Sequence, residues 1–205
     1  LGQVLILYIL GLKIGLLRKD LKRALFNQKL KDLKSLPKLV ERTLMVDNKI
    51  QSISNTFNDA KGSMFLGRGF SFPIALEGAL KLKELSYIHA EGYPAGEMKH
   101  GPLALIEEGM PVVVLAPRDS YYQKTISNMQ EVIARGAKVL LITDRSEDEL
   151  VSENIWEKIE VESSNEDLLP FLLTIPLQKL AYYSALKKGF DIDKPRNLAK
   201  SVTVE

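Results

Sequence analysis

The first 60 residues repeat apolar positions at the spacing of helices. Val4–Leu17 is mostly apolar and is interrupted by Lys13. It is shorter than the roughly 20 residues that a membrane span needs, so we expect a buried helix. Asp20–Lys34 carries leucines on one side and lysines on the other, and Leu36–Phe57 repeats apolar residues at steps of 3 to 7 positions. Both of these patterns favour amphipathic helices.

From residue 63 onward, short apolar runs alternate with longer helical patterns. Strands are expected at Met64–Leu66, Pro111–Ala116, Lys138–Thr143 and Trp156–Val161. Helices are expected at Ser71–His89, Ser120–Arg135 and Leu168–Lys188, with a Gly/Pro-rich loop at Ala90–Pro102 and a short turn or helix at Leu103–Ile106. This alternation predicts an α/β fold in which helices flank a parallel sheet.

A turn rich in glycine follows the first predicted strand. It reads Gly67-Arg68-Gly69 and lies where that strand ends. Ligands of open parallel sheets bind at the carboxyl ends of strands, and backbone N–H groups in such a turn can hold an anion. The loop after the next helix carries Glu91, Glu97, Lys99 and His100. Strand, turn, helix and charged loop together indicate a ligand site.

Three charged residues share one stripe of the helix predicted at Ser71–His89. Glu77, Lys81 and Glu84 are spaced i, i+4, i+7, while the other faces are largely apolar. Charges among apolar residues need partners or a polar cavity, because burying an unpaired charge is costly. The stripe fits a solvated ion pair, and it also fits a carboxylate and a lysine tuned for proton transfer. Spacing alone does not choose between these two interpretations.

Composition limits the classes of function. The 205 residues are 45% hydrophobic and 26% charged, which suits one sizeable domain with helical additions. The net charge of +2 shows no strong bias toward nucleic acid or an anionic membrane. The absence of cysteine excludes disulfides, thiolate metal sites and a cysteine nucleophile in this chain. Two histidines eleven positions apart make a poor metal site, and we expect His89 to be a packed residue at a helix end.

Two long motifs carry a resemblance to a known family. They are GRGFSFPIALEGALKLKELSYIHAEGYPAGEMKHGPLALI, at residues 67–106, and DIDKPRNLAKSVTVE, at residues 191–205. In both, the chain resembles the C-terminal sugar-isomerase (SIS) domain of glutamine–fructose-6-phosphate aminotransferases (isomerizing), also called glucosamine-6-phosphate synthases. The sequence resemblance is strong over residues 67–205. In the preceding residues the chain resembles the family in the arrangement of its elements more than in its amino acids.

The resemblance implies a flavodoxin-like SIS fold in three parts. Residues 1–60 would be a helical segment made of the end of a preceding SIS domain and linker helices. Residues 61–190 would be a second SIS domain, and residues 191–205 an active-site tail. The chain starts at Leu1 inside an apolar helical pattern, so we expect a piece of a longer protein whose glutaminase domain and most of whose first SIS domain lie outside this chain.

The resemblance also implies an activity. Members of the family join glutamine-derived ammonia to fructose 6-phosphate and isomerise the product to glucosamine 6-phosphate, in amino-sugar (UDP-GlcNAc) biosynthesis. They would be cytoplasmic homodimers with a shared active site, no cofactor, and neither a nucleic-acid nor a membrane partner. This chain lacks the family's Ser/Thr-rich phosphate loop, so we expect little or no activity from it alone.

Residue roles follow from the same resemblance. Glu84 would be the base that moves a proton between neighbouring carbons, with Lys81 and Glu77 as its supporting pair. His100 would assist ring opening in the site of a neighbouring subunit. Lys200 would form a Schiff base with the ketone. The remaining candidates are the substrate-binding residues of the tail, Arg196, Asn197 and Ala199.

Other functions of the same fold remain open. SIS domains occur in regulators that bind phosphosugars without converting them, and in deglycases and plain sugar-phosphate isomerases. A regulator would not need Glu84 or Lys200, and it usually carries a helix-turn-helix reader that residues 1–60 lack. The ending DKPRNLAKSVTVE argues against these alternatives.

Overall fold

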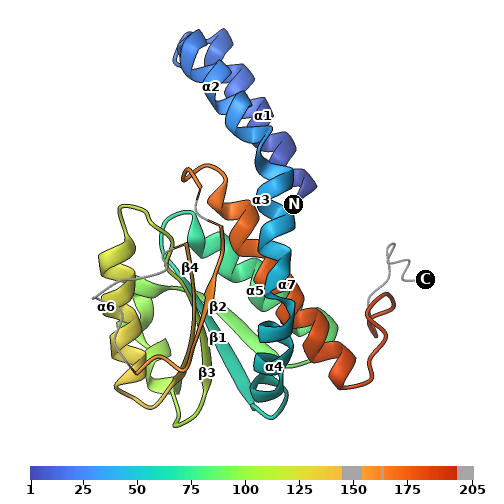
Figure 1. Ribbon diagram of the computed structural model, residues 1–205. Coiled ribbons are helices and arrows are strands. Elements are labelled where there is room, and N and C mark those ends of the chain that lie inside the picture. Colours follow the sequence, from blue (N-terminus) through green and yellow to red (C-terminus); the bar gives the residue numbers. More distant parts are fainter. Residues whose placement is uncertain (145–153, 163, 198–205) are drawn as a thin grey trace, which may run out of the picture.

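The computed structural model describes residues 1–144, 154–162 and 164–197 (Figure 1). Within these residues, five strands form one parallel sheet in the order β2-β1-β3-β4-β5. The strands are β1 (Gly62–Gly67), β2 (His89–Pro94), β3 (Pro111–Leu115), β4 (Lys138–Thr143) and β5 (Glu157–Glu160). This is the flavodoxin-like strand order, and the expected α/β fold is confirmed.

Helices cover both faces of the sheet. One face packs against α4 (Asp47–Asn58), α5 (Ser71–Ser86) and α7 (Leu169–Lys187), and the other against α6 (Tyr122–Ile133) and the 3-10 turns η2 (Ala95–His100) and η3 (Pro102–Leu105). Along β3, Val113 and Leu115 face the α5 side while Val112 and Val114 face the α6 side. Both faces are apolar because both are covered, which explains the unbroken apolar run.

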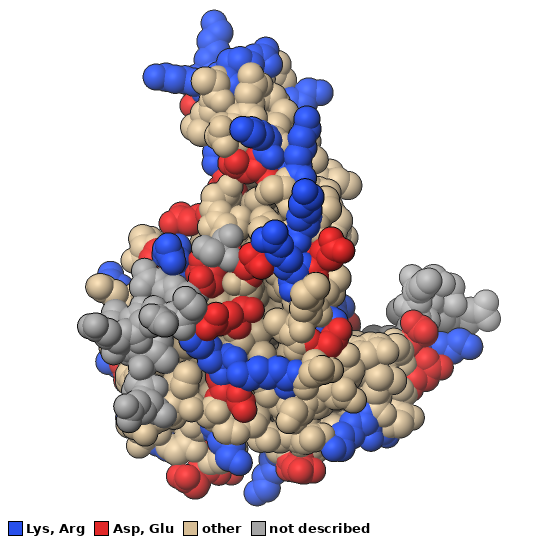
Figure 2. Space-filling view, in the orientation of Figure 1, with Lys and Arg blue, Asp and Glu red and all other residues tan. Residues whose placement is uncertain are grey.

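Two helices at the amino end project from the sheet as an arm. This helical arm consists of α1 (Gly2–Leu17) and α2 (Arg23–Leu33), packed antiparallel (Figure 1). Its tip carries Arg18, Lys19, Lys22 and Arg23, and Lys and Arg gather there on the surface in Figure 2. The chain then returns through α3 (Leu36–Thr43) and η1 (Leu44–Val46) to α4. The expected single helix over Leu36–Phe57 is therefore divided by the 3-10 turn.

The prediction that Val4–Leu17 is a buried helix is wrong. The segment is helical, but Ile6 and Leu7 are 67% and 66% exposed, and within α1, which is described in full, Leu12 is the one buried residue. The helix is apolar on all sides, and α2 covers one side only. None of the helices within the described residues combines the length and the apolar character needed to cross a membrane.

The helix expected at Ser71–His89 and the loop expected after it are both corrected. α5 ends at Ser86, because Tyr87 takes a left-handed conformation with φ 58°. Residues His89–Pro94 then form β2, with Gly62 opposite His89 and Gly67 opposite Pro94. Glycine and proline weaken a strand signal, but an edge strand tolerates both. Gly92 is required by packing, since a Cβ there would lie 2.9 Å from the Cα of Leu76.

Candidate active site

The charged stripe of α5 forms a connected cluster. Lys81 Nζ lies 2.6 Å from Glu84 Oε2 and 3.9 Å from Glu77 Oε1. The side chains of Lys81, Glu84 and Glu77 are 30%, 29% and 38% exposed. The expected sharing of one helix face is confirmed. Because the cluster is only partly solvated, a ligand that covered it would strengthen its electrostatic interactions.

A groove runs beside this cluster. Lys81 and Leu85 line one wall, Tyr182 and Ile192 lie on the α7 side, and its volume is about 670 Å³. Its lining is largely apolar, with the ammonium group of Lys81 as a polar group at the wall. An apolar groove with few polar groups is the ordinary form of a binding site, and a partner domain can also fill it.

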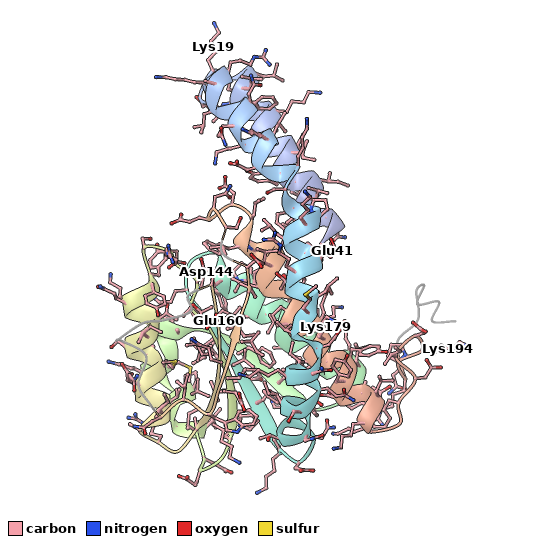
Figure 3. All side chains as sticks on the ribbon, in the orientation of Figure 1. Lys19, Glu41, Asp144, Glu160, Lys179 and Lys194 are labelled. Atoms are coloured by element: carbon pink, nitrogen blue, oxygen red, sulfur yellow. The ribbon has the colours of Figure 1, made fainter. Side chains whose placement is uncertain are left out.

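The groove also borders an ion pair between α4 and α7. Asp47 accepts hydrogen bonds from Lys179 Nζ and, across 2.8 Å, from Tyr183 Oη. Lys179 lies on α7, on the side that meets α4 (Figure 3). The hydrogen bond from Lys179 lowers the pKa of Asp47, and the hydrogen bond to Asp47 raises the pKa of Tyr183. This pair ties α4 to α7, and both of its residues line the groove together with Lys81.

The start of the C-terminal tail docks one turn beyond Glu84. The backbone N–H of Arg196 donates to Tyr87 Oη across 2.8 Å, and its guanidinium lies 4.0 Å from the centre of the Tyr87 ring. Phe190 packs on the same ring, with 4.7 Å between centroids. Asn197, with φ 61°, ends the described part of the tail, and Ala199 and Lys200 lie outside the described residues.

Tyr87 is a site residue that sequence reasoning missed. Its signal is weak, because a tyrosine at a helix end is ordinary, and its role depends on a contact 109 positions away along the chain. Arg196 is thus brought to the end of α5 that carries Glu84.

His100 lies on the other side of the sheet from Glu84. It ends η2, which packs on the α6 face, whereas Glu84 belongs to α5 on the opposite face. Its imidazole is 76% exposed, and Nε2 is 3.8 Å from Glu97 Oε2. The structure does not bring His100 to the α5 cluster within one chain. A site that used both residues would need two copies of the chain.

The turn Gly67-Arg68-Gly69 lies at the carboxyl end of β1, as expected, but its arginine is engaged within the chain. Arg68 Nη1 donates to Asn128 Oδ1 across 2.9 Å. A Cβ at Gly96 would lie 2.9 Å from the same nitrogen, so the guanidinium rests on the backbone of η2. This turn is a packing junction between β1, η2 and α6.

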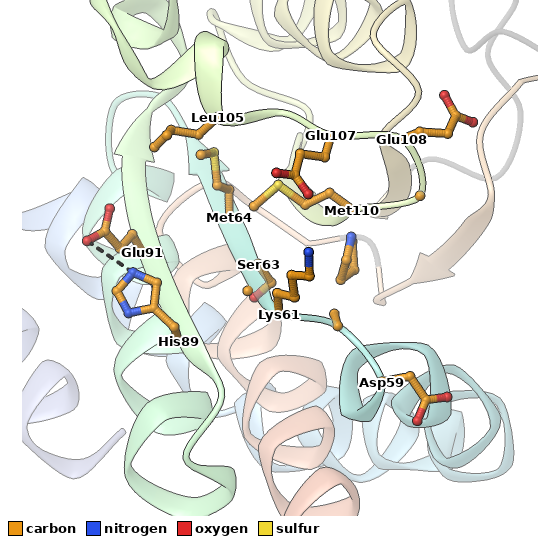
Figure 4. A pocket seen from close by; sticks show the side chains of 14 residues that line it. Asp59, Lys61, Ser63, Met64, His89, Glu91, Leu105, Glu107, Glu108 and Met110 are labelled. Carbon is orange, nitrogen blue, oxygen red and sulfur yellow. Dashed lines mark ion pairs between the residues drawn. The ribbon is translucent and has the colours of Figure 1, made fainter.

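A second cavity, of about 540 Å³, lies at the amino ends of β1, β2 and β3 (Figure 4). Glu91, from the charged loop expected at the ligand site, lines it, whereas Glu77, Lys81, Glu84 and His100 do not. His89 does, and the prediction of a packed helix-end histidine is wrong. It begins β2, is 71% exposed, and its Nε2 is 3.5 Å from Glu91 Oε1. Within the described parts of the chain, no three His, Asp or Glu side chains converge to hold a metal ion.

Comparison with known proteins identifies the class. The family model for the SIS domain matches residues 56–188. The chain therefore belongs to the SIS domain family. The boundaries expected near residues 60 and 190 remain a prediction, and Ile50, Ile53 and Phe57 of α4 pack in the same core as the sheet.

The relatives within this family share one name. The chain is 51% identical over 179 residues to the glutamine–fructose-6-phosphate aminotransferase [isomerizing] of Bartonella henselae, covering 87% of this chain and 30% of that protein. It is 47% identical to the protein of the same name from Aquifex aeolicus, covering 100% of this chain and 33% of that protein. The resemblance drawn from the two motifs is confirmed. The chain spans about a third of the length of these curated relatives.

Solved structures support the same family assignment. The C-terminal domain of glucosamine-fructose-6-phosphate aminotransferase from Francisella tularensis superposes with a TM-score of 0.85 at 45% identity, covering 89% of this chain and 51% of that one. Glucosamine-6-phosphate deaminase from Thermotoga maritima superposes with a TM-score of 0.65 at 28% identity, covering 83% and 49%.

Proposed function

We propose that this chain is the second SIS domain of a glutamine–fructose-6-phosphate aminotransferase and carries the acid–base half of its isomerase site. The observation that supports this most is the Lys81–Glu84 hydrogen bond of 2.6 Å on α5, with the tail docked on Tyr87 one turn further along. The α5 cluster and the tail belong to the two motifs that carry the resemblance, and the matches to the two curated relatives cover 87% and 100% of this chain.

Glu84 is the proton shuttle in this proposal. In isomerisation without ammonia, the carboxylate takes the proton from C1 of open-chain fructose 6-phosphate and returns it to C2. A second proton moves from O1 to O2, so ketone and aldehyde exchange without net loss of atoms or electrons. Lys81 holds Glu84 in place and offers positive charge near the enediolate oxygen. Glu77 balances the charge of Lys81 from 3.9 Å.

The remaining roles rest on the same proposal. In the amination, the amine of Lys200 condenses with the C2 ketone, whose oxygen leaves as water, and ammonia then displaces the lysine from this Schiff base. Arg196, Asn197 and Ala199 hold the tail over the substrate. His100 opens the sugar ring from the partner subunit of a cytoplasmic homodimer, because it lies on the other face of the sheet from Glu84. Fructose 6-phosphate and glucosamine 6-phosphate are the ligands.

The exposed apolar surface of α1 supports a further partner. Ile6, Leu7 and Leu17 are 67%, 66% and 72% exposed, and the Lys81 groove opens beside Leu1. We assign this surface to the preceding SIS domain, which would also supply the phosphate site. The glutaminase domain would likewise belong to the N-terminal part of the longer protein, outside this chain, and this chain alone should have little or no activity.

The test uses a longer protein in which a first SIS domain precedes this chain. Conversion of fructose 6-phosphate to glucose 6-phosphate is followed without glutamine, for the parent and for Glu84→Gln. We expect kcat to fall by about 100-fold or more, the usual range for removing a general base. Glu157→Gln is the matched control, because Glu157 is 34% exposed, pairs with Lys49 at 3.0 Å, lies on the edge strand β5 and does not line the groove.

Each result has a distinct meaning. Equal activity in the parent and Glu84→Gln would show that Glu84 is not the base. Tight binding of fructose 6-phosphate by an inactive parent would instead favour the second candidate, a phosphosugar-binding regulator of the same fold.

A further inference from the structure

The side chain of His100 makes few contacts that would hold it in one position. Its side chain is 76% exposed, and the nearest charged partner is Glu97 at 3.8 Å, whose side chain is itself 65% exposed. Its position therefore depends on the backbone of η2. A 3-10 turn has strained hydrogen bonds and is a poor support by itself. Gly101, with φ 145°, follows at once and adds no side chain to the support.

A polar network ties this turn to the rest of the domain. Lys99 Nζ, next to His100, lies 3.1 Å from Glu131 Oε1 of α6. Glu131 Oε1 also accepts from Asn128 Nδ2 at 3.5 Å, and Asn128 Oδ1 accepts from Arg68 Nη1 at 2.9 Å. The network thus runs from the carboxyl end of β1, through α6, to the residue beside His100.

The network is built to hold the turn closely. Asn128, at its centre, is 8% exposed, and the side chain of Glu131 is 23% exposed. The guanidinium of Arg68 rests on the backbone of Gly96, where a Cβ would come within 2.9 Å of Nη1 and 3.0 Å of Nη2. Met98, from the middle of the turn, is buried in the core beneath α6. Both ends of η2 are therefore anchored, one by Arg68 and the other by Glu131.

We propose that Arg68 and Glu131 are positioning residues for His100, holding η2 so that the imidazole is presented to the active site of the partner subunit. This inference rests on the proposed function, because the network affects catalysis only through the ring-opening role that the proposed function assigns to His100. Neither residue touches the substrate. Small displacements of a reacting group lower rate strongly, so a network that fixes one turn has a catalytic effect at a distance.

The test is a double-mutant cycle in the longer protein. Glu131→Gln keeps the shape of the side chain and removes the charge that Lys99 faces. We expect it to lower kcat for fructose 6-phosphate by about ten-fold while KM stays within about two-fold, because the phosphate is held elsewhere. In a His100→Gln background, Glu131→Gln should cause no further loss, because residues that act as one unit are not additive. Arg68→Gln should behave in the same way.

Two measures separate positioning from general stability. Glu157→Gln, which breaks the comparable Lys49–Glu157 pair at 3.0 Å, should leave kcat unchanged. If Glu131→Gln unfolds the protein, Lys99→Gln tests the same contact from a side chain that is 62% exposed. Its melting temperature should shift by no more than about 2 °C.

Other outcomes overturn the proposal. An equal loss of kcat from Glu131→Gln with and without His100 would mean that the network acts on the fold and not through the histidine. Unchanged kcat in both Glu131→Gln and Arg68→Gln would mean that the turn needs no such support. Unchanged kcat in His100→Gln alone would refute the role of His100 and this inference with it, while a loss in Glu84→Gln would still uphold the proposed function.

Discussion

Lys81 Nζ donates a hydrogen bond of 2.6 Å to Glu84 Oε2, across one turn of α5. Both side chains are about a third exposed, so the pair adds little to stability, and Lys81 lines the adjoining groove.

Lys81→Met removes the ammonium partner of Glu84. We expect kcat for isomerisation in the longer protein to fall by about 10- to 100-fold, while the free energy of unfolding changes by less than about 1 kcal/mol. Steady-state kinetics and urea unfolding measure the two effects. Lys49→Met, which breaks a pair at 3.0 Å with Glu157, is the control, because neither residue lines the groove. Full activity in Lys81→Met would make the pair purely structural.

The separation of His100 from Glu84 predicts complementation between subunits. Glu84→Gln and His100→Gln proteins, each nearly inactive, are mixed and allowed to exchange subunits. One site of each mixed dimer then has both native residues, so about a quarter of the parent activity should return in an equimolar mixture. No recovery, with exchange verified by mass spectrometry of the native complex, would place His100 in the site of its own chain or outside the site.

The Tyr87 anchor predicts how the tail responds to mutation. Tyr87→Phe removes the hydroxyl that accepts from the Arg196 N–H and keeps the ring under the guanidinium. Tyr87→Asn removes both and still tolerates the left-handed conformation. We expect trypsin to cleave after Arg196 fastest in Tyr87→Asn, more slowly in Tyr87→Phe, and most slowly in the parent. Equal cleavage rates in all three would mean that Tyr87 does not hold the tail.

The Asp47–Lys179 pair predicts a pH-dependent contribution to stability. The pKa of Asp47 is lowered from 3.8, mainly by the hydrogen bond from Lys179. A lowered pKa in the folded state stabilises the protein above the ordinary value, and the contribution is lost as pH falls through the lowered one. Asp47→Asn should therefore cost about 0.5–1 kcal/mol at pH 7, and less near pH 3. Urea unfolding at both pH values measures this, and an equal cost at both would contradict it.

Gly78 predicts a packing limit between α5, β1 and α7. A Cβ there would lie 2.8 Å from Leu177 Cδ1 and 3.0 Å from Phe65 Cδ1. Gly78→Ala should destabilise the fold by about 1–3 kcal/mol, although alanine favours helix by about 1 kcal/mol. Gly11→Ala in α1, with no atom within 4 Å of the added Cβ, should not destabilise. A stabilised Gly78→Ala would show that α7 shifts without cost.

Much of the fold could be predicted from local patterns. The runs at β1, β3 and β4 were evident because strands buried on both faces are continuously apolar. The strand β5 was evident from the alternation of polar and apolar residues around it. The strand β2 was not, since its Gly and Pro residues read as a loop and its pairing with β1 is a long-range contact. The exposure of α1 was also missed, because an apolar helix has the same sequence whether or not a partner covers it.

The candidate site could also be predicted only in part from the sequence. The spacing of Glu77, Lys81 and Glu84 by itself determined that they share a helix face, because the α-helix repeats every 3.6 residues. The three-dimensional structure was needed to show which carboxylate Lys81 approaches most closely, that Tyr87 receives the tail, and that His100 lies beyond the sheet. The contact between Tyr87 and Arg196 joins residues 109 positions apart, and the place of His100 depends on the face of the sheet on which η2 packs, so the packing of whole elements sets both.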